Sequence, residues 1–431
     1  MNKLFLLGAV LSALCPLALG QAQENVLYSF AGSPDGTAPV GKLVADSVGN
    51  LYGTTSAGGS TAYCEGCGTV FELFRNTDGT YTESILYEFC QQASCTDGWN
   101  PQAGLVFDAS GNLYGTTLSG GGPQCYQGGG CGTVFELSPP SNSGSPWSVT
   151  QLYQFCQLPG QDTCPDGALS ASKLVFDSIG NLYGTKSRGG ANGVGGVVFE
   201  LSPSGNGWTE AVLYSFCSEK SGGNCADGSV PMAGVTFDKS GNIYGTTESG
   251  GSNKYIGGGV VYELSKSKGA WKESVLHAFV AQNGPDGGTL LGEVDLDAAG
   301  NIYSTALQGG LDNLGVVFRL NGKGQNEQFL SFDGANGASP TTGVLIDAKS
   351  GALYGTTSGG GSGNGTVYKV AGSHEIVVLY SFDGATNGDG SNPEGALILD
   401  DKGNLYGTTK AGGVVSSDCD TGCGTVFEIS R

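Results

Sequence analysis

Two acidic residues, Glu293 and Asp295, stand two positions apart in a short, mostly apolar segment of the sequence. Paired carboxyl groups supply the general acid and base of glycosidases and lyases, so this pair is a candidate for such chemistry. Residues two apart on a strand share one face, but this alone does not establish the separation that the reaction needs. The pair is therefore not sufficient to define an active site.

The two histidines of the chain, His277 and His374, do not belong to a recognisable catalytic set. His277 replaces a tyrosine of a recurring segment, which favours a packing role. No Ser/His/Asp triad can be assembled from residues that break the repeat pattern, and sialidase-type Asp boxes are absent from the sequence. We expect a protein that is not an enzyme, with a hydrolase or lyase as the alternative.

Twelve of the thirteen cysteines form neighbouring couples, and Cys15 stands apart near the N-terminus. The couples are Cys64 with Cys67, Cys90 with Cys95, Cys125 with Cys131, Cys156 with Cys164, Cys217 with Cys225, and Cys419 with Cys423. Six local disulfides formed in an oxidising compartment are the simplest explanation. Zinc or redox chemistry is the weaker interpretation, because the chain has two histidines and no second couple with zinc-finger spacing.

A recurring Asp-Gly pair offers carboxylate oxygens of the kind that calcium binds. It occurs at Asp35, Asp97, Asp166, Asp227, Asp286 and Asp389, with Asp333 less well aligned. No Asp-x-Asp-x-Asp-Gly loop is present in the sequence, and Asp-Gly is an ordinary turn sequence. We therefore expect structural turns and no cofactor, with calcium as the alternative.

The elements that must position these residues are marked by a phrase that occurs seven times. Its commonest form is Asn-Leu-Tyr-Gly-Thr-Thr, and the copies begin at Asn50, Asn112, Asn181, Asn242, Asn301, Ala352 and Asn404. A period of about 50 to 70 residues with several short apolar runs in each unit is typical of propellers. The sequence predicts an all-β fold, a seven-bladed β-propeller with four-stranded antiparallel blades.

The clearest unit predicts the four strands of one blade, which we name A to D from the centre of the ring outward. They are expected at 105–108, 113–117, 133–137 and 149–155. The A strands are apolar at nearly every position, which predicts burial on both faces. The connection from A to B contains Asp108 and Asn112, which we interpret as turn residues rather than ligands.

The two ends of the repeat region predict how the ring closes. A lone D-type strand at 26–30 precedes the first unit, and the last unit stops after its C strand at 424–429. Pairing between these strands would complete one blade and cover an exposed sheet edge. We expect a single propeller domain over 26–431, closed by the N-terminal strand, and a monomer.

Departures from the repeat pattern place charged residues on one face of the A strands. Lys42, Lys173, Glu293 and Asp295 occupy positions that are small or apolar in other copies. Because unpaired buried charges are costly, we expect these groups to be hydrated or paired in the wall of a central channel. A solvated channel rim is favoured over an active site.

The predicted disulfides all lie in D-to-A and B-to-C loops, which leave a propeller on one face. These loops also contain aromatic residues that the repeat does not require, at Tyr63, Trp99, Tyr126 and Tyr255. Rings on rigid loops suit sugar or protein ligands, because they bury large areas with little loss of rotamer freedom. The alternative is that the rings only cover loop backbone.

The N-terminal residues and the overall charge restrict the cellular context. Residues 1–20 combine Lys3, a short apolar core and a small-residue end, which predicts a secretory signal peptide, and no other segment is long and apolar enough to span a bilayer. The formal net charge of −20 disfavours nucleic acid and anionic membranes. We expect a secreted protein, periplasmic or extracellular.

The Leu-Tyr-Gly-Thr-Thr, Gly-Gly and Gly-Thr-Val-Phe-Glu-Leu pattern resembles the Gloeobacter and Verrucomicrobia (GloVer) repeat of secreted bacterial proteins, over essentially all of 26–431. The resemblance implies a secreted, propeller-like protein without an established activity. Such proteins often carry a C-terminal surface anchor. The repeats here run to the last residue, and we expect no anchor.

These observations favour a secreted binding platform that recognises a glycan or a protein through its disulfide-bonded loop face. One alternative is a calcium-assisted extracellular hydrolase or lyase that acts on a polysaccharide or a lactone. A further alternative is a structural component of the cell envelope. Fold alone does not distinguish these functions, because propellers serve many chemistries and many binding roles.

Overall fold

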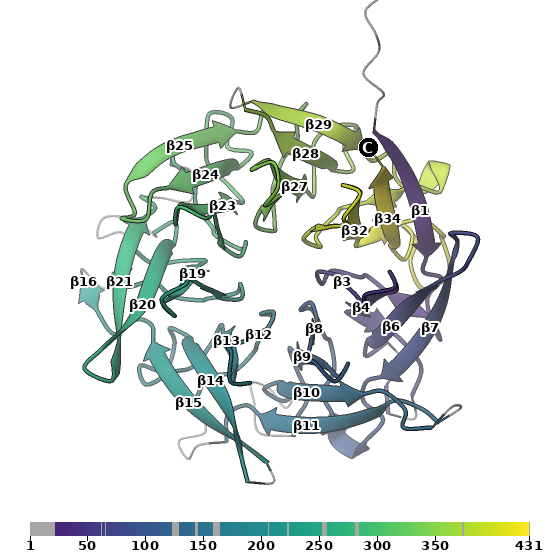
Figure 1. The fold of residues 1–431 in the computed structure, drawn as a ribbon, viewed down its shortest axis with the longest axis horizontal. Helices are drawn as coiled ribbons and strands as arrows, with labels where there is room; N and C mark the ends of the chain where they lie inside the picture. Colours follow the sequence, from purple (N-terminus) through teal and green to yellow (C-terminus); the bar gives the residue numbers. More distant parts are fainter. Residues whose placement is uncertain are drawn as a thin grey trace, which may run out of the picture.

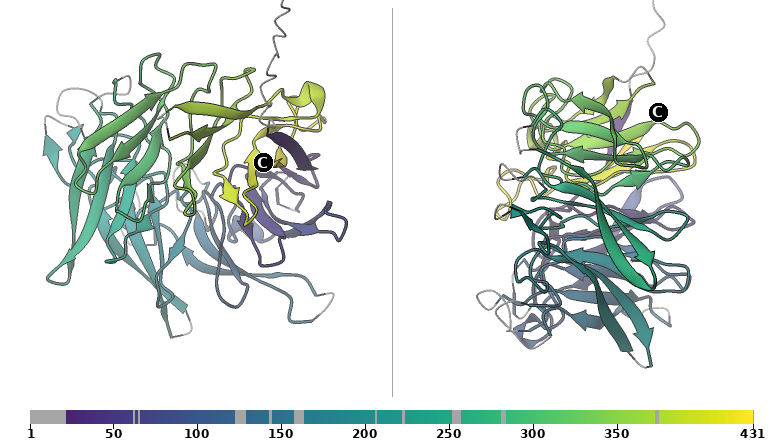
Figure 2. Two further views of the ribbon diagram at one scale, coloured as in Figure 1. Left: turned by 45° about the horizontal axis from the view of Figure 1, so that its top comes forward. Right: turned by 90° about the vertical axis from the view of Figure 1, so that its left-hand side faces the viewer.

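Seven four-stranded antiparallel sheets surround a central opening in the computed structural model of the protein (Figure 1). The structure describes residues 22–61, 63–64, 66–122, 129–142, 145–157, 164–205, 207–221, 224–251, 257–280, 284–372 and 375–430. The predicted signal peptide at 1–20 lies outside these residues. Seven repeats thus form a seven-bladed propeller, as the sequence predicts. Seen from the side, the ring is a disc with loops on both faces (Figure 2).

In each blade the strands follow one another from the centre outward, apart from the closing strand described below. Blade 1 contains β3 (Val44–Ala45), β4 (Leu51–Thr55), β6 (Thr69–Arg75) and β7 (Tyr81–Glu88). Blade 2 contains β8 (Val106–Phe107), β9 (Leu113–Thr117), β10 (Thr133–Ser138) and β11 (Ser148–Gln154). Blade 3 contains β12 (Val175–Phe176), β13 (Leu182–Lys186), β14 (Val197–Ser204) and β15 (Gly207–Ser215).

The next three blades have the same order. Blade 4 contains β18 (Thr236–Phe237), β19 (Ile243–Thr247), β20 (Val260–Ser267) and β21 (Ala270–Ala278). Blade 5 contains β22 (Asp295–Leu296), β23 (Ile302–Ala306), β24 (Val316–Leu320) and β25 (Asn326–Ser331). Blade 6 contains β26 (Leu345–Ile346), β27 (Leu353–Thr357), β28 (Thr366–Val370) and β29 (Ile376–Ser381).

Blade 7 is built from both ends of the chain, in the order β31 (Ile398–Leu399), β32 (Leu405–Thr409), β34 (Thr425–Ser430) and β1 (Gln23–Ser29). Val26 of β1 pairs with Phe427 of β34, and Figure 1 shows the two strands side by side. The predicted ring closure is confirmed. Since the N-terminal strand supplies the outer edge, the last repeat needs no D strand of its own.

The remaining elements are short and belong to the loops. Three two-stranded ladders pair β2 (Gly36–Thr37) with β5 (Ala57–Gly58), β16 (Lys220–Ser221) with β17 (Asn224–Cys225), and β30 (Gly390–Ser391) with β33 (Ala411–Gly412). Within the described residues, two short 3-10 turns follow D strands, and they are η1 (Ala93–Cys95) and η3 (Ala385–Asn387).

The turn between strands A and B explains why Asp and Asn recur in every repeat but one. Asp108 Oδ1 accepts the Asn112 backbone N–H at 2.9 Å, and Asp108 Oδ2 accepts the Asn112 side-chain amide at 2.8 Å. The Tyr114 hydroxyl donates to the same oxygen at 3.2 Å. These groups satisfy one another within the turn, as expected of turn residues.

The glycine of the repeated phrase makes room for an aromatic ring of the neighbouring C strand. A Cβ atom on Gly53 would lie 2.6 Å from Cζ of Phe71, so glycine lets the ring pack closely against the B strand in this blade. The rings also join the blades, because Phe89 of one blade meets Phe135 of the next edge to face at 5.1 Å. The aromatic residue of the C strand therefore packs both against the B strand of its own blade and against the preceding blade.

The A strands differ from expectation in length and burial. Each forms only two ladder residues, such as Val106 and Phe107, and both are half-buried rather than enclosed on both faces. The reason is that the A strands line the central cavity, which Val175 and Phe176 border in blade 3. The innermost strands therefore have one face toward the central cavity.

Candidate functional site

The loops of blades 1 and 2 enclose a hollow of about 440 Å³ that contains two of the predicted aromatic residues. We call it the loop hollow, and it is lined by Tyr63, Cys64, Cys67, Ser94, Cys95, Trp99 and Gly129. Tyr63 exposes 57% of its surface, whereas Trp99 is half-buried on a hydrophobic cluster of blades 1 and 2. The exposed ring of Tyr63 and the half-buried ring of Trp99 therefore line the same hollow.

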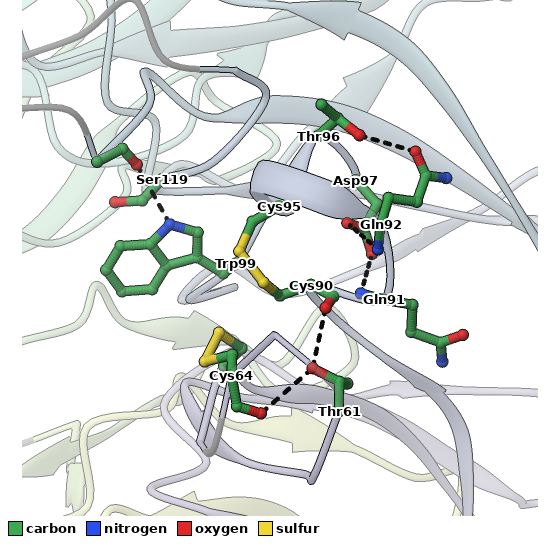
Figure 3. Close-up of a disulfide and its surroundings, with 12 residues drawn as sticks. Thr61, Cys64, Cys90, Gln91, Gln92, Cys95, Thr96, Asp97, Trp99 and Ser119 are labelled. Atoms are coloured by element: carbon green, nitrogen blue, oxygen red, sulfur yellow. Dashed lines mark hydrogen bonds between the residues drawn. A yellow bond between two sulfur atoms is a disulfide. The ribbon is translucent and has the colours of Figure 1, made fainter.

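Two adjacent disulfides hold the walls of this hollow. Cys64 is bonded to Cys67 in the B-to-C loop, and Cys90 is bonded to Cys95 in the following D-to-A loop. The sulfur atoms of Cys64, Cys67 and Cys90 all lie within 4.8 Å of one another, and Figure 3 shows the two bridges side by side. The B-to-C loop and the D-to-A loop are therefore each closed by a disulfide, and the two disulfides lie next to each other.

Hydrogen bonds connect the same loops across the hollow. Thr61 Oγ1 donates to the carbonyl oxygens of Cys64 at 3.2 Å and Cys90 at 2.9 Å, as Figure 3 shows. The Trp99 indole N–H donates to the Gly129 carbonyl at 3.2 Å, which ties the blade 1 loops to blade 2. The orientation of the indole is fixed before any ligand arrives, and such preorganisation lowers the cost of binding.

The Asp-Gly carboxylates act as anchors of the D-to-A loops. Asp97 is buried and accepts the Tyr87 hydroxyl at 2.7 Å and the backbone N–H groups of Gln91 at 2.9 Å and Gln92 at 3.2 Å. Tyr214 and Tyr380 make the same contact with Asp227 and Asp389. Among the described residues, no three carboxylates converge on one position that a metal ion could occupy.

Other predicted residues of the loop face lie apart from the loop hollow or outside the described residues. Tyr126, Tyr255 and Cys125 belong to the second group. His374, which the sequence does not place on this face, is also outside the described residues. Cys131 is disulfide-bonded, as its predicted pairing requires. Three further predicted bridges are formed, between Cys156 and Cys164, Cys217 and Cys225, and Cys419 and Cys423.

His277 packs against its own D strand and the loop that follows it. Its Nε2 lies 3.3 Å from Asp286, in the place of the Tyr–Asp contact of other blades, and its ring meets Phe279 edge to face at 4.7 Å. Both neighbours belong to the same D strand and its loop. No serine hydroxyl hydrogen-bonds His277 within the part of the chain that the structure describes.

The four predicted channel residues border a central cavity of about 520 Å³. Lys42 and Lys173 come from blades 1 and 3, and Glu293 and Asp295 from blade 5. Burial lowers the pKa of Lys42, and the nearby charge of Lys173 lowers it further. Burial raises the pKa of Asp295, although the Leu296 backbone N–H donates to its carboxylate at 2.9 Å.

The channel charges do not pair directly. None of the ion pairs found between described residues joins a channel lysine to Glu293 or Asp295. Two lysines and two acidic residues therefore line one central cavity. The four side chains make this part of the cavity wall polar.

Sequence reasoning missed one buried group of chemical interest, Lys186 at the end of β13. It replaces a threonine of the repeated phrase and is fully buried beside Glu210 of β15. The signal was visible, since every other copy of the phrase ends in threonine or alanine. Its partner could not be identified from the sequence, because the contact depends on how blades 2 and 3 pack.

Fold and site together define a seven-bladed propeller with disulfide-supported loops around an aromatic hollow. A model of the Gloeobacter/Verrucomicrobia repeat family matches residues 12–257 and 234–431, so the chain belongs to this family. The disulfides fit an extracellular or periplasmic protein. In the described part of the chain, no helix has the length and hydropathy needed to traverse a membrane.

The solved structures that resemble this protein are distant in sequence. A Bacteroides fragilis protein provisionally assigned as a 6-phosphogluconolactonase is 13% identical with a TM-score of 0.50, covering 90% of this chain and 100% of that protein. A similarly assigned Bacteroides uniformis protein is 15% identical with a TM-score of 0.48, covering 81% and 86%. No curated protein matches the sequence. At this level of identity the likeness concerns the fold alone.

Proposed function

We propose that the protein is a secreted carbohydrate-binding propeller whose ligand occupies the loop hollow. The observation that supports this most directly is the exposed Tyr63 ring beside the Trp99 indole, on loops held by two adjacent disulfides. Aromatic rings cover the apolar faces of sugars with little loss of side-chain entropy. Rigid loops lower the ordering cost that a flexible site would add.

The size and charge of the site narrow the ligand class. A hollow of about 440 Å³ suits a few sugar units, whereas a stable protein interface buries about 800 Å² on each partner. The net charge of −20 disfavours polyanionic glycans. We therefore infer a neutral oligosaccharide, with a protein ligand as the competing outcome.

Secretion is part of the same proposal. The apolar segment at 1–20 has the pattern of a signal peptide, and the cysteine couples require an oxidising compartment to form bonds. A glycan ligand is available outside the cell or in its envelope. Location and ligand class are thus consistent.

The alternatives have less support. A calcium-assisted hydrolase or lyase would need carboxylates free to coordinate, but buried groups such as Asp97 already accept hydrogen bonds from the protein. Glu293 and Asp295 share their cavity with two lysines rather than with an ordered acid–base partner. A structural envelope component would not need an exposed ring in a preorganised hollow.

The test is binding of the purified protein to an array of neutral oligosaccharides, followed by titration calorimetry with the best ligand. Replacing the exposed ring, Tyr63→Ala, should weaken affinity at least about tenfold, which corresponds to about 1.4 kcal/mol. Folding should be unaffected, since this ring is largely exposed.

A matched control is Leu311→Ala in the B-to-C loop of blade 5, because Leu311 is 89% exposed and lies outside the loop hollow. This variant should bind like the wild type. Retention of no neutral glycan, or equal affinity of the Tyr63→Ala variant, contradicts the proposal. Capture of a protein ligand that is lost in the same variant would keep the site and change the ligand class.

A further inference from the structure

The interface between blades 2 and 3 contains a lysine that is fully removed from solvent. Lys186 Nζ contacts Glu210 Oε1 and donates to the Asp166 backbone carbonyl at 2.7 Å. The side chains of Lys186 and Glu210 expose 0% and 4% of their surface. The other six blades have a small residue at the position of Lys186: Thr55, Thr117, Thr247, Ala306, Thr357 and Thr409.

The surroundings of this amine are aromatic. Nζ lies 4.3 Å from the ring centre of Phe155, 5.0 Å from that of Phe199 and 5.4 Å from that of Tyr153. Burial lowers the pKa of Lys186 and raises the pKa of Glu210, although their mutual attraction opposes both shifts. Keeping two full charges in such a site is costly, which favours the neutral amine and the neutral carboxyl group.

A second carboxylate lies in the same site. Asp166 is fully buried, and its Oδ2 accepts the Gln157 backbone N–H at 2.9 Å and the Tyr153 hydroxyl at 3.4 Å. Its Oδ1 has no hydrogen-bond partner among the described residues. Tyr153 also hydrogen-bonds Glu210. An amine, an acyl group, a free carboxylate oxygen and a hydroxyl donor therefore meet in one buried pocket.

We propose that Lys186 and Glu210 react to form an intramolecular isopeptide bond that links β13 to β15 of blade 3. The amine lone pair attacks Cδ of the protonated Glu210 carboxyl group, and a nitrogen–carbon bond forms. The hydroxyl group then leaves with one amine proton as water, so no oxidant, reductant or activating group is required. Asp166 relays the proton from the nitrogen to the departing oxygen, and Tyr153 donates a hydrogen bond to the acyl oxygen.

The bond has a structural rationale in this position. Strands β13 and β15 are not neighbours, because β14 lies between them in the sheet. An amide also replaces two buried ionisable groups with one that cannot ionise, so the desolvation cost of an ion pair cannot arise at this position. The product therefore spans the blade across a strand and leaves no charge on either reacting side chain.

The test is mass spectrometry of the full secreted chain after its disulfides have been reduced and alkylated. The intact mass should be lower than the sequence mass by one water molecule. Trypsin cleaves after Arg188 and separates 174–188 from 189–220, but the bond should keep these two peptides together, with Lys186 uncleaved. Fragmentation should assign the link to Lys186 and Glu210.

The control variant is Lys186→Thr, which restores the residue of other repeats. It should have the full sequence mass and release 189–220 as a free peptide. The proposal is overturned if the wild type has its full mass and yields free 174–186, which contains an unmodified Lys186. A link from Lys186 to the peptide 76–173, which contains Asp166, would also overturn the assignment to Glu210. The wild-type measurement decides the matter even if the variant does not fold.

Discussion

Single residues of the repeated phrase have distinct physical tasks in this propeller. Asn112 closes a turn with Asp108, and the next tyrosine, Tyr114, adds its hydroxyl to the same carboxylate. Gly53 leaves space for the Phe71 ring. These contacts explain why the same residues recur in most repeats. A residue that breaks the pattern therefore needs a separate physical explanation.

One such departure is a tyrosine in place of phenylalanine on a C strand. The hydroxyl of Tyr262 is buried and has no hydrogen-bond partner among the described residues, whereas Phe71 and Phe135 occupy this position in blades 1 and 2. Tyr262→Phe should raise the free energy of unfolding by about 1 kcal/mol, because an unsatisfied buried hydroxyl is removed. Denaturant unfolding of the purified protein measures the change.

The matched variant for this prediction is Tyr244→Phe in the same blade. Tyr244 donates to Glu263 at 3.1 Å and Asp238 at 3.5 Å, so its loss should lower stability by a similar amount. If Tyr262→Phe destabilises the protein as Tyr244→Phe does, the Tyr262 hydroxyl is hydrogen-bonded after all.

A partly buried glutamate recurs on the D strands and lies at the contact between neighbouring blades. Glu24, Glu83 and Glu273 each lie near the Asp of the preceding D-to-A loop, and burial raises the pKa of Glu24 and Glu83 to about 7 and that of Glu273 to about 8. The neighbouring aspartates Asp389, Asp35 and Asp227 add to these shifts. In blade 3, Lys186 stands between the equivalent pair, Glu210 and Asp166.

These interfaces predict that the protein is more stable in mild acid than in base. The folded state retains protons that the unfolded chain releases above its ordinary Glu pKa of 4.5. The stability that protonation provides is therefore present below that value and is lost as the pH rises through about 7 to 8. Melting temperatures measured between about pH 5 and pH 8.5 should fall steadily.

Glu273→Gln is the informative variant, because an amide of the same shape cannot ionise. Its melting temperature should decline less than that of the wild type over the same pH range. An equal decline in both proteins would mean that Glu273 does not contribute to the pH dependence.

At the scale of the whole molecule, the architecture was readable because it is periodic. Strands β9, β10 and β11 begin and end within one residue of their predicted bounds, since the B, C and D segments recur in each repeat and are separated by glycine-containing connections. The A strands were expected to be longer and more enclosed, because apolar residues that line an opening resemble buried ones in sequence. Periodicity therefore predicted the blades better than it predicted their inner rim.

The candidate site was less accessible to sequence reasoning than the fold. Tyr63 and Trp99 were singled out because they depart from the repeat, but their shared hollow depends on non-repeating loops and on the Trp99 contact with Gly129. The pairing of Lys186 with Glu210 depends on the packing of blade 3 against Tyr153 of blade 2. Such contacts arise from three-dimensional packing, which a one-dimensional pattern does not encode.

Closure of the ring depends on the first described strand. Phe30 follows β1 and is fully buried, with its ring 5.1 Å from Phe71 of blade 1, while its backbone N–H donates to the Gly424 carbonyl at 3.0 Å. Deleting residues 22–30 removes this contact and exposes the edge of β34. The melting temperature should fall by about 10 °C, because loss of a buried phenylalanine alone costs about 3 to 5 kcal/mol. Calorimetry on the shortened protein measures this.

The same deletion also predicts a change in association. An uncovered β34 presents unpaired backbone groups that can bind another chain, so the shortened protein should elute from a sizing column as larger species. A synthetic peptide of residues 22–30 should restore both the melting temperature and the elution volume, because it can refill the vacant position beside β34. If the shortened protein melts and elutes like the wild type, β1 does not hold the ring closed, and the seventh blade must be stable with three strands.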